Sequence, residues 1–182
     1  AMRQYRDMKG EIPEGAILLF RMGDFYELFF EDAREAAPLM DVVLTKRGGV
    51  PMCGVPHHSV QLYVKRLLDQ GRKVAIAEQL EDPKQAKGLV KRGITRVVTP
   101  GTILEDDSLQ ASRSNFLVCV CPHRKKVGVA LLDVSTGDFR GTELADRAGL
   151  EVELHRLQPA ECLVPQSVYD DWSAQAALPD CP

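Results

Sequence analysis

The chain has 182 residues, of which 45% are hydrophobic and 27% are charged, a composition typical of folded globular proteins and not of disordered ones. No apolar run approaches the roughly 20 residues of a membrane helix, and the first ten residues lack the apolar core of an export signal. A cytoplasmic protein is therefore expected. Residues 45–100 carry 11 Lys/Arg and 4 Asp/Glu, between two acidic segments. This basic segment suits a polyanion partner, although charge alone favours an ordinary solvated surface.

The first hundred residues mix helical and strand patterns. Apolar periodicity and turn residues predict, in chain order, a helix at 2–10, strands at 16–22 and 25–29, a helix at 31–40, a hairpin at 42–55, a helix at 60–70 with Ser59 as its N-cap, and strands at 73–79 and 94–101. Residues 82–88 indicate a turn or one helical turn. Pro38 should kink the second helix or end it early, because it lacks an amide hydrogen. Strands mixed with helices over about 100 residues indicate an α/β or α+β domain.

A second pattern follows a break in periodicity. Residues 101–113 carry Gly, Ser and Asp without a regular apolar repeat, which indicates a linker. The patterns beyond it predict a meander of strands at 116–121, 126–137 and 138–144, a helix at 148–157, a strand at 160–165 and a final helix. The order β-β-β-α-β-α suggests a second α/β domain at 114–182. About 70 residues make a thin core for a self-sufficient α/β domain, so this domain is expected to stop early.

The chain lacks the motifs of common enzyme classes. It has no phosphate-binding loop, dinucleotide fingerprint, nucleophile elbow or zinc-protease motif. One enzyme alternative stays open, a Mg²⁺-dependent nuclease, although exposed acids in turns are the commoner case; its candidate ligands are Asp133, Asp138, Glu143 and Asp146.

Cysteine and histidine usage indicates no metal site. The five cysteines include no C-x-x-C pair, so they are expected to be reduced and mostly buried. His57 and His58 are adjacent and therefore point in different directions, which favours a loop role or a phosphate contact over chelation of a metal.

The segment RMGDFYELFFEDA, residues 21–33, combines aromatic and acidic side chains around a Gly-Asp turn. Phe29 and Phe30 are assigned to the core and to the start of the helix. Phe25 would also be a core residue on composition alone. However, it follows the turn, and in an extended strand it points to the same side as Glu27. An exposed Phe beside a carboxylate could unstack a mispaired base, which is already poorly stacked, and hydrogen-bond to its edge.

Several motifs, in the same order, resemble the MutS family of DNA mismatch repair proteins. They are MGDFYELFFEDA, LTKRG, PMCGVPHHSVQLYVKRLLDQGRKVAIAEQLEDP, KGLVKRGITRVVTPGT and LLDVSTGDFR. The likeness spans nearly the whole chain and identifies it as an amino-terminal fragment. It implies a mixed-sheet mismatch-recognition domain at 1–100, and part of a connector domain at 114–182 with a ribonuclease H-like fold and no nuclease activity.

The resemblance also implies roles for individual residues. Phe25 would stack on the mispaired base and Glu27 would hydrogen-bond to it. Further DNA contacts are implied at Met22, Lys46, Arg47, Met52, Pro56 and His58. The charges of Lys46 and Arg47 lie at the hairpin turn of the basic segment, which suits contact with backbone phosphates.

For the complete protein the resemblance implies an ATPase that uses ATP and Mg²⁺, whereas the fragment itself is expected to be no enzyme and to hold no cofactor. The implied partners are duplex DNA with mismatches, MutL-type repair proteins, and a second copy bound through regions outside this chain. The implied location is the bacterial cytoplasm at the nucleoid, with no membrane. A pure protein-interaction module, with residues 101–182 docking partner proteins, is the other alternative left open.

Overall fold

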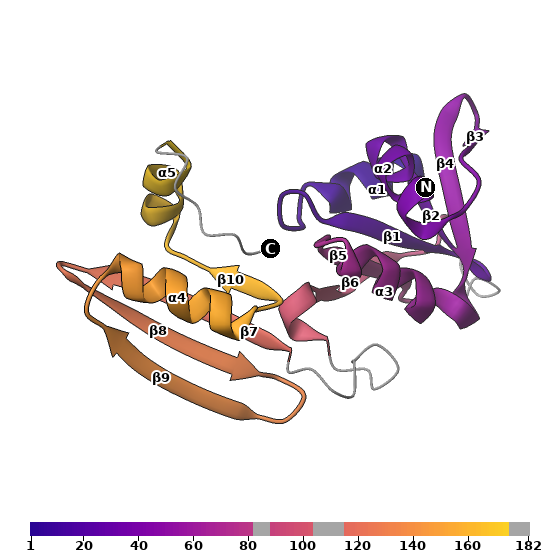
Figure 1. Cartoon of the computed structure of the whole chain (residues 1–182). Helices are drawn as coiled ribbons and strands as arrows, with labels where there is room; N and C mark the ends of the chain where they lie inside the picture. Colours follow the sequence, from indigo (N-terminus) through magenta and orange to yellow (C-terminus); the bar gives the residue numbers. More distant parts are fainter. Residues whose placement is uncertain (82–87, 104–114, 175–182) are drawn as a thin grey trace. The chain divides into compact units, whose positions relative to one another are not determined.

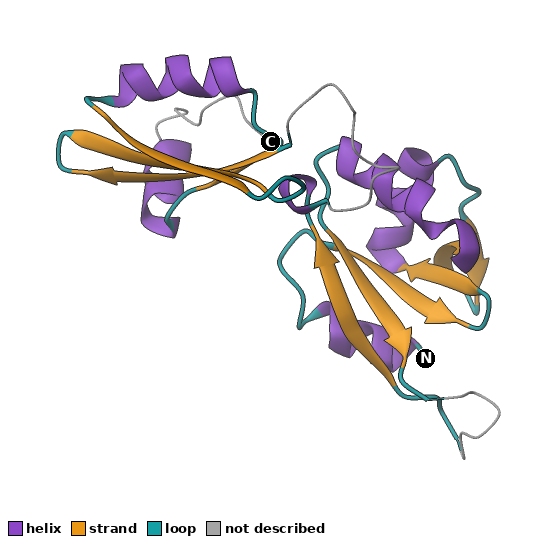
Figure 2. Ribbon diagram, turned by 90° about the horizontal axis from the view of Figure 1, so that it is seen from below, coloured by secondary structure: helices purple, strands orange, loops and turns teal. Residues whose placement is uncertain are grey.

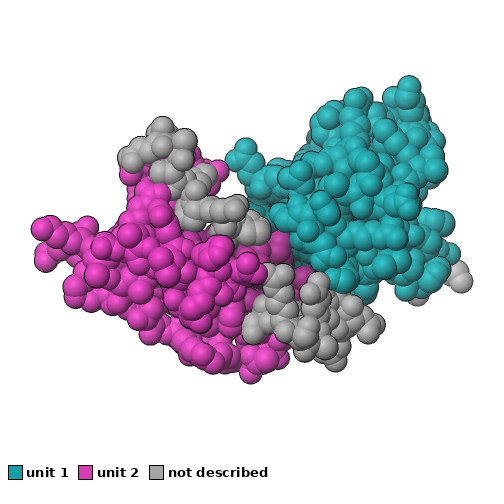
Figure 3. Space-filling model, viewed as in Figure 1, with its two compact units in different colours: residues 1–99 teal, residues 100–182 magenta. Residues whose placement is uncertain are grey.

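The computed structural model describes residues 1–81, 88–103 and 115–174. The chain divides into two units, Ala1–Thr99 and Pro100–Pro182 (Figure 3). Most of the predicted turn at 82–88 and of the predicted linker at 101–113 lies outside the described residues, so these two assignments stay predictions. Within the part of the chain that the structure describes, no helix is long and apolar enough to span a membrane.

Unit 1 is built on a six-stranded sheet with the strand order β3-β4-β2-β1-β5-β6 (Figure 1). The parallel pair is β1 with β5, and every other neighbouring pair is antiparallel. The strands are β1 (Ile17–Met22), β2 (Phe25–Phe29), β3 (Thr45–Arg47), β4 (Val50–Pro56), β5 (Val74–Gln79) and β6 (Arg92–Val98). The mixed sheet that the family resemblance implied is confirmed.

Helices cover both faces of this sheet, and the alternation of side chains along the strands explains why. Helix α1 (Met2–Lys9) packs Tyr5 and Met8 on one face, against Leu18, Phe20 and Phe29. The other face carries α2 (Phe30–Met40) and α3 (Val60–Asp69), which follows the short 3-10 helix η1 (His57–Ser59) (Figure 2). Phe29 is fully buried and Phe30 begins α2. The assignment of these two residues to the core and to the helix start is therefore confirmed.

The structure contradicts two local expectations for unit 1, an early end of the second helix at Pro38 and a cap by Ser59, while a kink at Pro38 stays a prediction. Helix α2 does not end early at Pro38; it continues to Met40, and Asp41 ends it with a φ of 59°. Pro38 lies in the last turn, where it removes only one amide donor, and a buried stripe that includes Ala33 and Met40 holds the helix against its neighbours. Ser59 is the residue before α3, but its hydroxyl donates to the carbonyl of Pro56 at 3.3 Å and does not cap the helix.

Unit 2 has a four-stranded sheet with the order β10-β7-β8-β9, in which β10 runs parallel to β7. Its elements are the 3-10 helix η2 (Pro100–Thr102), β7 (Phe116–His123), β8 (Lys126–Asp133), β9 (Asp138–Leu144), α4 (Arg147–Leu157), β10 (Glu161–Leu163) and α5 (Gln166–Ala174). Val118, Val120, Leu150, Leu154 and Trp172 lie in its core. The predicted order β-β-β-α-β-α is confirmed.

The cysteines that the structure describes in unit 2 contradict the expectation of mostly buried thiols. Cys119 and Cys121 are exposed and Cys162 is half-buried, whereas Cys53 in unit 1 is buried. Cys119 and Cys121 alternate along β7 with Val118 and Val120, whose side chains lie in the core. Successive residues of a strand point to opposite faces, so these cysteines lie on the face that the described core does not use.

Candidate nucleic-acid interface

The register of the sheet brings several predicted site residues of unit 1 to one face. Met22 pairs with Phe25 across β1 and β2, and Phe25 pairs with Pro56 across β2 and β4. Paired residues of antiparallel strands point to the same side, and Glu27, two residues further along β2, points to that side as well. We call this surface the Phe25 face and define it by Met22, Phe25, Glu27, Arg47 and Pro56.

Phe25 is the exposed aromatic side chain of this face. It has a relative exposure of 48%, whereas the next four residues of β2 are buried. The turn before it needs Gly23, whose φ of 61° is unfavourable for residues with a Cβ. His57 fixes the turn from the other side, because its backbone amide donates to the carbonyl of Asp24 at 2.9 Å. A turn held by a backbone hydrogen bond therefore presents an apolar ring to solvent.

Glu27 is not exposed beside Phe25, which corrects the expectation of an exposed pair. The relative exposure of Glu27 is only 7%. Its Oε2 lies 2.5 Å from the Nη1 of Arg47, which donates a hydrogen bond and forms an ion pair with it. The same Nη1 lies 3.8 Å from the sulfur of Met22. Burial raises the pKa of Glu27, and the charge of Arg47 opposes this shift.

A glycine lies beside Glu27 on the neighbouring strand. Gly54 pairs with Glu27 across β2 and β4. A Cβ at position 54 would lie 3.3 Å from the carbonyl oxygen of Tyr26 and 3.6 Å from the Cγ of Glu27. The missing side chain leaves room on this face of β4, and it allows a group from β3 or from a ligand to approach Glu27.

Arg92 is a residue of this neighbourhood that sequence reasoning missed. Its guanidinium carbon lies 4.9 Å from the centroid of the Phe20 ring, and its Nε donates to the carbonyl of Arg21 at 2.6 Å. Burial lowers the pKa of Arg92 and the charge of Glu27 opposes that shift. The basic composition of residues 45–100 includes Arg92, but nothing in its local sequence distinguishes it from the other cations of that segment.

The structure does not bring the remaining predicted contacts together on the Phe25 face. Met52 pairs with Phe29 and packs against the core under α1. His58 is exposed in η1, with its ring 5.9 Å from that of His57. Lys46 alternates with Arg47 along β3 and therefore points to the opposite side of the sheet, where it helps to line an open pocket of about 480 Å³ with Arg34, Leu44, Thr45 and Pro51.

The four acids considered as nuclease ligands each have a structural partner. Asp133 accepts hydrogen bonds from the hydroxyl of Ser135 at 2.6 Å and from the amide of Asn115 at 3.2 Å; the bond from Ser135 is the main reason why its pKa is lowered. Asp138 pairs with Arg140, Glu143 with Lys126, and Asp146 caps α4 by accepting from the amide of Gly149. Among the described residues, no three His, Cys, Asp or Glu side chains are placed to share a metal ion.

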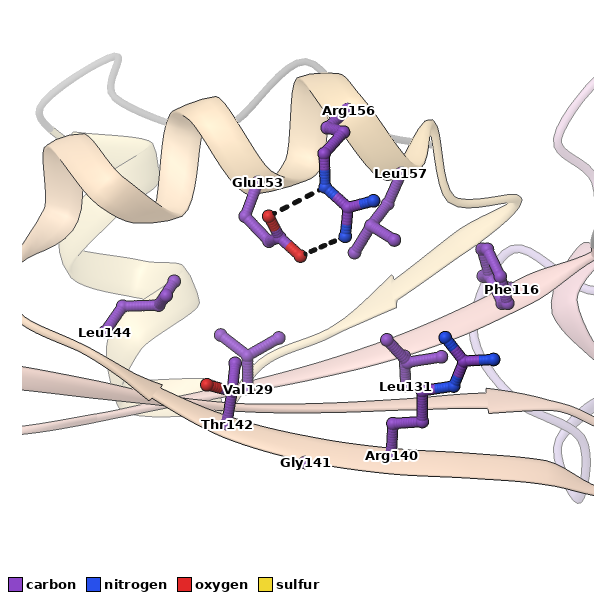
Figure 4. Close-up of a pocket in the computed structure, with 10 residues that line it drawn as sticks. All are labelled: Phe116, Val129, Leu131, Arg140, Gly141, Thr142, Leu144, Glu153, Arg156 and Leu157. Carbon is purple, nitrogen blue, oxygen red and sulfur yellow. Dashed lines mark hydrogen bonds and ion pairs between the residues drawn. The ribbon is translucent and has the colours of Figure 1, made fainter.

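Unit 2 also has a pocket of about 390 Å³ between α4 and its sheet. Glu153 and Arg156 of α4 form a two-pronged ion pair above Val129 and Leu131 of β8 (Figure 4), with hydrogen bonds of 3.0 and 2.5 Å. The pair lowers the pKa of Glu153. The lining of the pocket is mainly apolar and includes none of the four acids of the nuclease alternative.

Comparison with known protein families matches the chain in two segments. The family model described as MutS domain I matches residues 1–107, and the model described as MutS domain II matches residues 115–179. The chain belongs to the MutS family. The fold class expected from the resemblance, two mixed α/β units, is confirmed with it.

Curated relatives that match the chain carry the name DNA mismatch repair protein MutS. The protein of Syntrophomonas wolfei is 51% identical over 171 residues, which is 90% of this chain and 20% of the relative. That of Streptococcus equi is 52% identical over 168 residues, again 90% and 20%, and that of Acaryochloris marina is 49% identical over 175 residues, 93% and 20%. The chain thus spans about a fifth of the length of these MutS relatives.

Proposed function

We propose that unit 1 recognises mispaired or unpaired bases in duplex DNA as part of a MutS-type mismatch repair protein. The observation that carries the proposal is the Phe25 face, where an exposed aromatic ring after a tight turn lies two residues from a carboxylate. The family match of unit 1 to MutS domain I and the names of the relatives support it.

The chemistry follows from what each group can do. A ring inserted beside a base pair unstacks it, and this costs less where the base is already mispaired. Phe25 supplies that ring, and Glu27 accepts a hydrogen bond from the base edge or, when protonated, donates one. Lys46 and Arg47 at the hairpin contact backbone phosphates, which contribute affinity but no base specificity. Met22, Met52, Pro56 and His58 complete the contact surface.

Further roles belong to the whole protein, by which we mean a protein of the relatives' length that carries this chain. There, an ATPase that uses ATP and Mg²⁺ would couple recognition to repair; the proposal assigns no cofactor to the 182 residues of this chain. Unit 2, as a connector, would contact MutL-type partner proteins, and a second copy would bind through other regions. The proposed location is the bacterial cytoplasm at the nucleoid.

The test is a fluorescence anisotropy titration of the whole protein with G·T-mismatched, single-insertion and matched duplexes at one fixed salt concentration. We expect Phe25→Ala to lower the preference for the defective duplexes about tenfold, since stacking of a base on an aromatic ring contributes about 1–3 kcal/mol. Phe139→Ala is the matched control, because Phe139 is a 70% exposed phenylalanine of unit 2. An unchanged preference in Phe25→Ala would show that Phe25 is not the wedge.

A further inference from the structure

The proposed role of Glu27 requires a carboxylate that a base can reach, yet in this structure the carboxylate is covered. Its Oε2 accepts from Arg47 at 2.5 Å. Arg47 belongs to β3, and β4 lies between β3 and the strand of Glu27. The Arg47 side chain, whose partner on β4 is Val50, therefore reaches diagonally over β4 to Glu27, whose own partner Gly54 presents no side chain there.

Two anions compete for Arg47 once DNA is present. The guanidinium group binds carboxylate and phosphate with the same two-pronged geometry. Arg47 is about half exposed at the end of a two-residue turn, whereas Glu27 is buried. The cation can therefore move toward a phosphate, while the carboxylate stays in place on its strand.

We propose that Arg47 is a specificity-determining residue that covers Glu27 in the free protein and moves from it to a backbone phosphate when a mismatched duplex binds. The proposal rests on the function proposed above for Phe25 and Glu27. On a mismatched duplex, the base edge replaces Arg47 as the partner of Glu27. On a matched duplex no base edge is offered, so the ion pair stays closed and Glu27 is not left as an unpaired charge beside the phosphates.

The inference predicts a specific pattern of non-additivity. In the whole protein, affinity is measured for wild type, Arg47→Gln, Glu27→Gln and the double variant. Because the pair exists only before a mismatched duplex binds, each single variant avoids the cost of opening it. The double variant should then lose more affinity for the mismatched duplex than the two single losses combined, by about two- to fivefold, the range expected for a partly exposed ion pair. On the matched duplex the double variant should lose only as much affinity as the two single variants combined.

Lys46→Gln provides the control cycle with Glu27→Gln. It removes the same charge one residue away, but Lys46 points to the other side of β3, so its effects should be additive with those of Glu27→Gln on both duplexes. Additive effects of Arg47→Gln and Glu27→Gln on the mismatched duplex would overturn the proposal. A combined loss smaller than the sum would also overturn it, because it would mean that Arg47 holds Glu27 within the complex.

The ion pair itself is tested in the free 182-residue chain by carbon-13 NMR titration of the Glu27 carboxyl. Arg47→Gln should raise the pKa of Glu27, and Lys46→Gln should not; an equal response would show that the pair does not form in solution. The neighbouring cation Arg92 is present in all variants and cancels in the comparison. Phe25→Ala, measured with both duplexes in the affinity experiment, separates this inference from the proposed function. If wild type prefers mismatched duplexes and Phe25→Ala does not, additive effects of Arg47→Gln and Glu27→Gln count against the role of Arg47 alone.

Discussion

At the scale of single residues, Asp32 is the buried charge on which unit 1 depends. Its carboxylate accepts hydrogen bonds from the hydroxyl of Tyr5 at 2.5 Å, from the amine of Lys9 at 2.6 Å and from the amide of Leu18 at 3.1 Å. These donors come from α1 and β1, so one side chain at the start of α2 joins three elements. Burial and the charge of Asp32 together raise the pKa of Tyr5, which stays a neutral donor.

We predict that Asp32→Ala lowers the free energy of unfolding by about 3–5 kcal/mol, because it leaves a buried hydroxyl, an ammonium group and an amide without their acceptor. Urea unfolding of the chain measures the change. Glu31→Ala is the control: Glu31 is the preceding residue of α2, it is exposed, and its contact with Arg34 is 3.4 Å, so its loss should change stability by no more than about 0.5 kcal/mol. Equal losses for both variants would contradict the role given to Asp32.

At the scale of elements, packing decides what the local sequence leaves open. Helix α2 passes Pro38 because its buried stripe compensates for one lost hydrogen bond. Strand β7 exposes Cys119 and Cys121 because Val118 and Val120, which alternate with them, take the side that faces the core. In both elements, the type of element was predictable from composition and periodicity, while the burial of particular side chains depended on what packs against them.

Helix α4 allows a direct test of packing in unit 2. Leu154→Ala should lower the free energy of unfolding by about 2–5 kcal/mol, since it removes a buried side chain and leaves a cavity against the sheet. Trp172 is the single tryptophan of the chain and lies in the same core, so its fluorescence reports the unfolding of unit 2. The control is Val152→Ala on the same helix, where the side chain is 69% exposed and the change should stay within about 0.5 kcal/mol. Similar midpoints for the two variants would contradict the assigned core.

At the scale of the whole molecule, charge separates the two units. Residues 1–99 carry 16 Lys/Arg and 13 Asp/Glu, and residues 100–182 carry 7 and 13. Contact with DNA phosphates through unit 1 therefore has a physical basis that unit 2 lacks. The net charge of −3 hides this difference.

Salt dependence tests this division in the whole protein. The logarithm of the affinity for matched duplex should fall linearly with the logarithm of the salt concentration, and Lys46→Gln should reduce the slope by about one, the loss of one phosphate contact. Lys126→Gln is the control in unit 2, where Lys126 pairs with Glu143, and it should leave the slope unchanged. Equal slopes for Lys46→Gln and wild type would mean that Lys46 does not contact phosphate.

The sequence by itself determined the order of elements and the family, because periodicity, turn residues and motif order are local properties of the chain. It also placed Phe25 and Glu27 on one side of a strand, since side chains alternate with a period of two. Only the tertiary structure decided that Phe25 is exposed while Glu27 is covered. The cover comes from Arg47, which lies 20 residues away in the chain and reaches Glu27 because β3, β4 and β2 lie in that order beside Gly54. Strand order and the long reach of one cation are properties of the folded sheet, and no local pattern in the sequence encodes them.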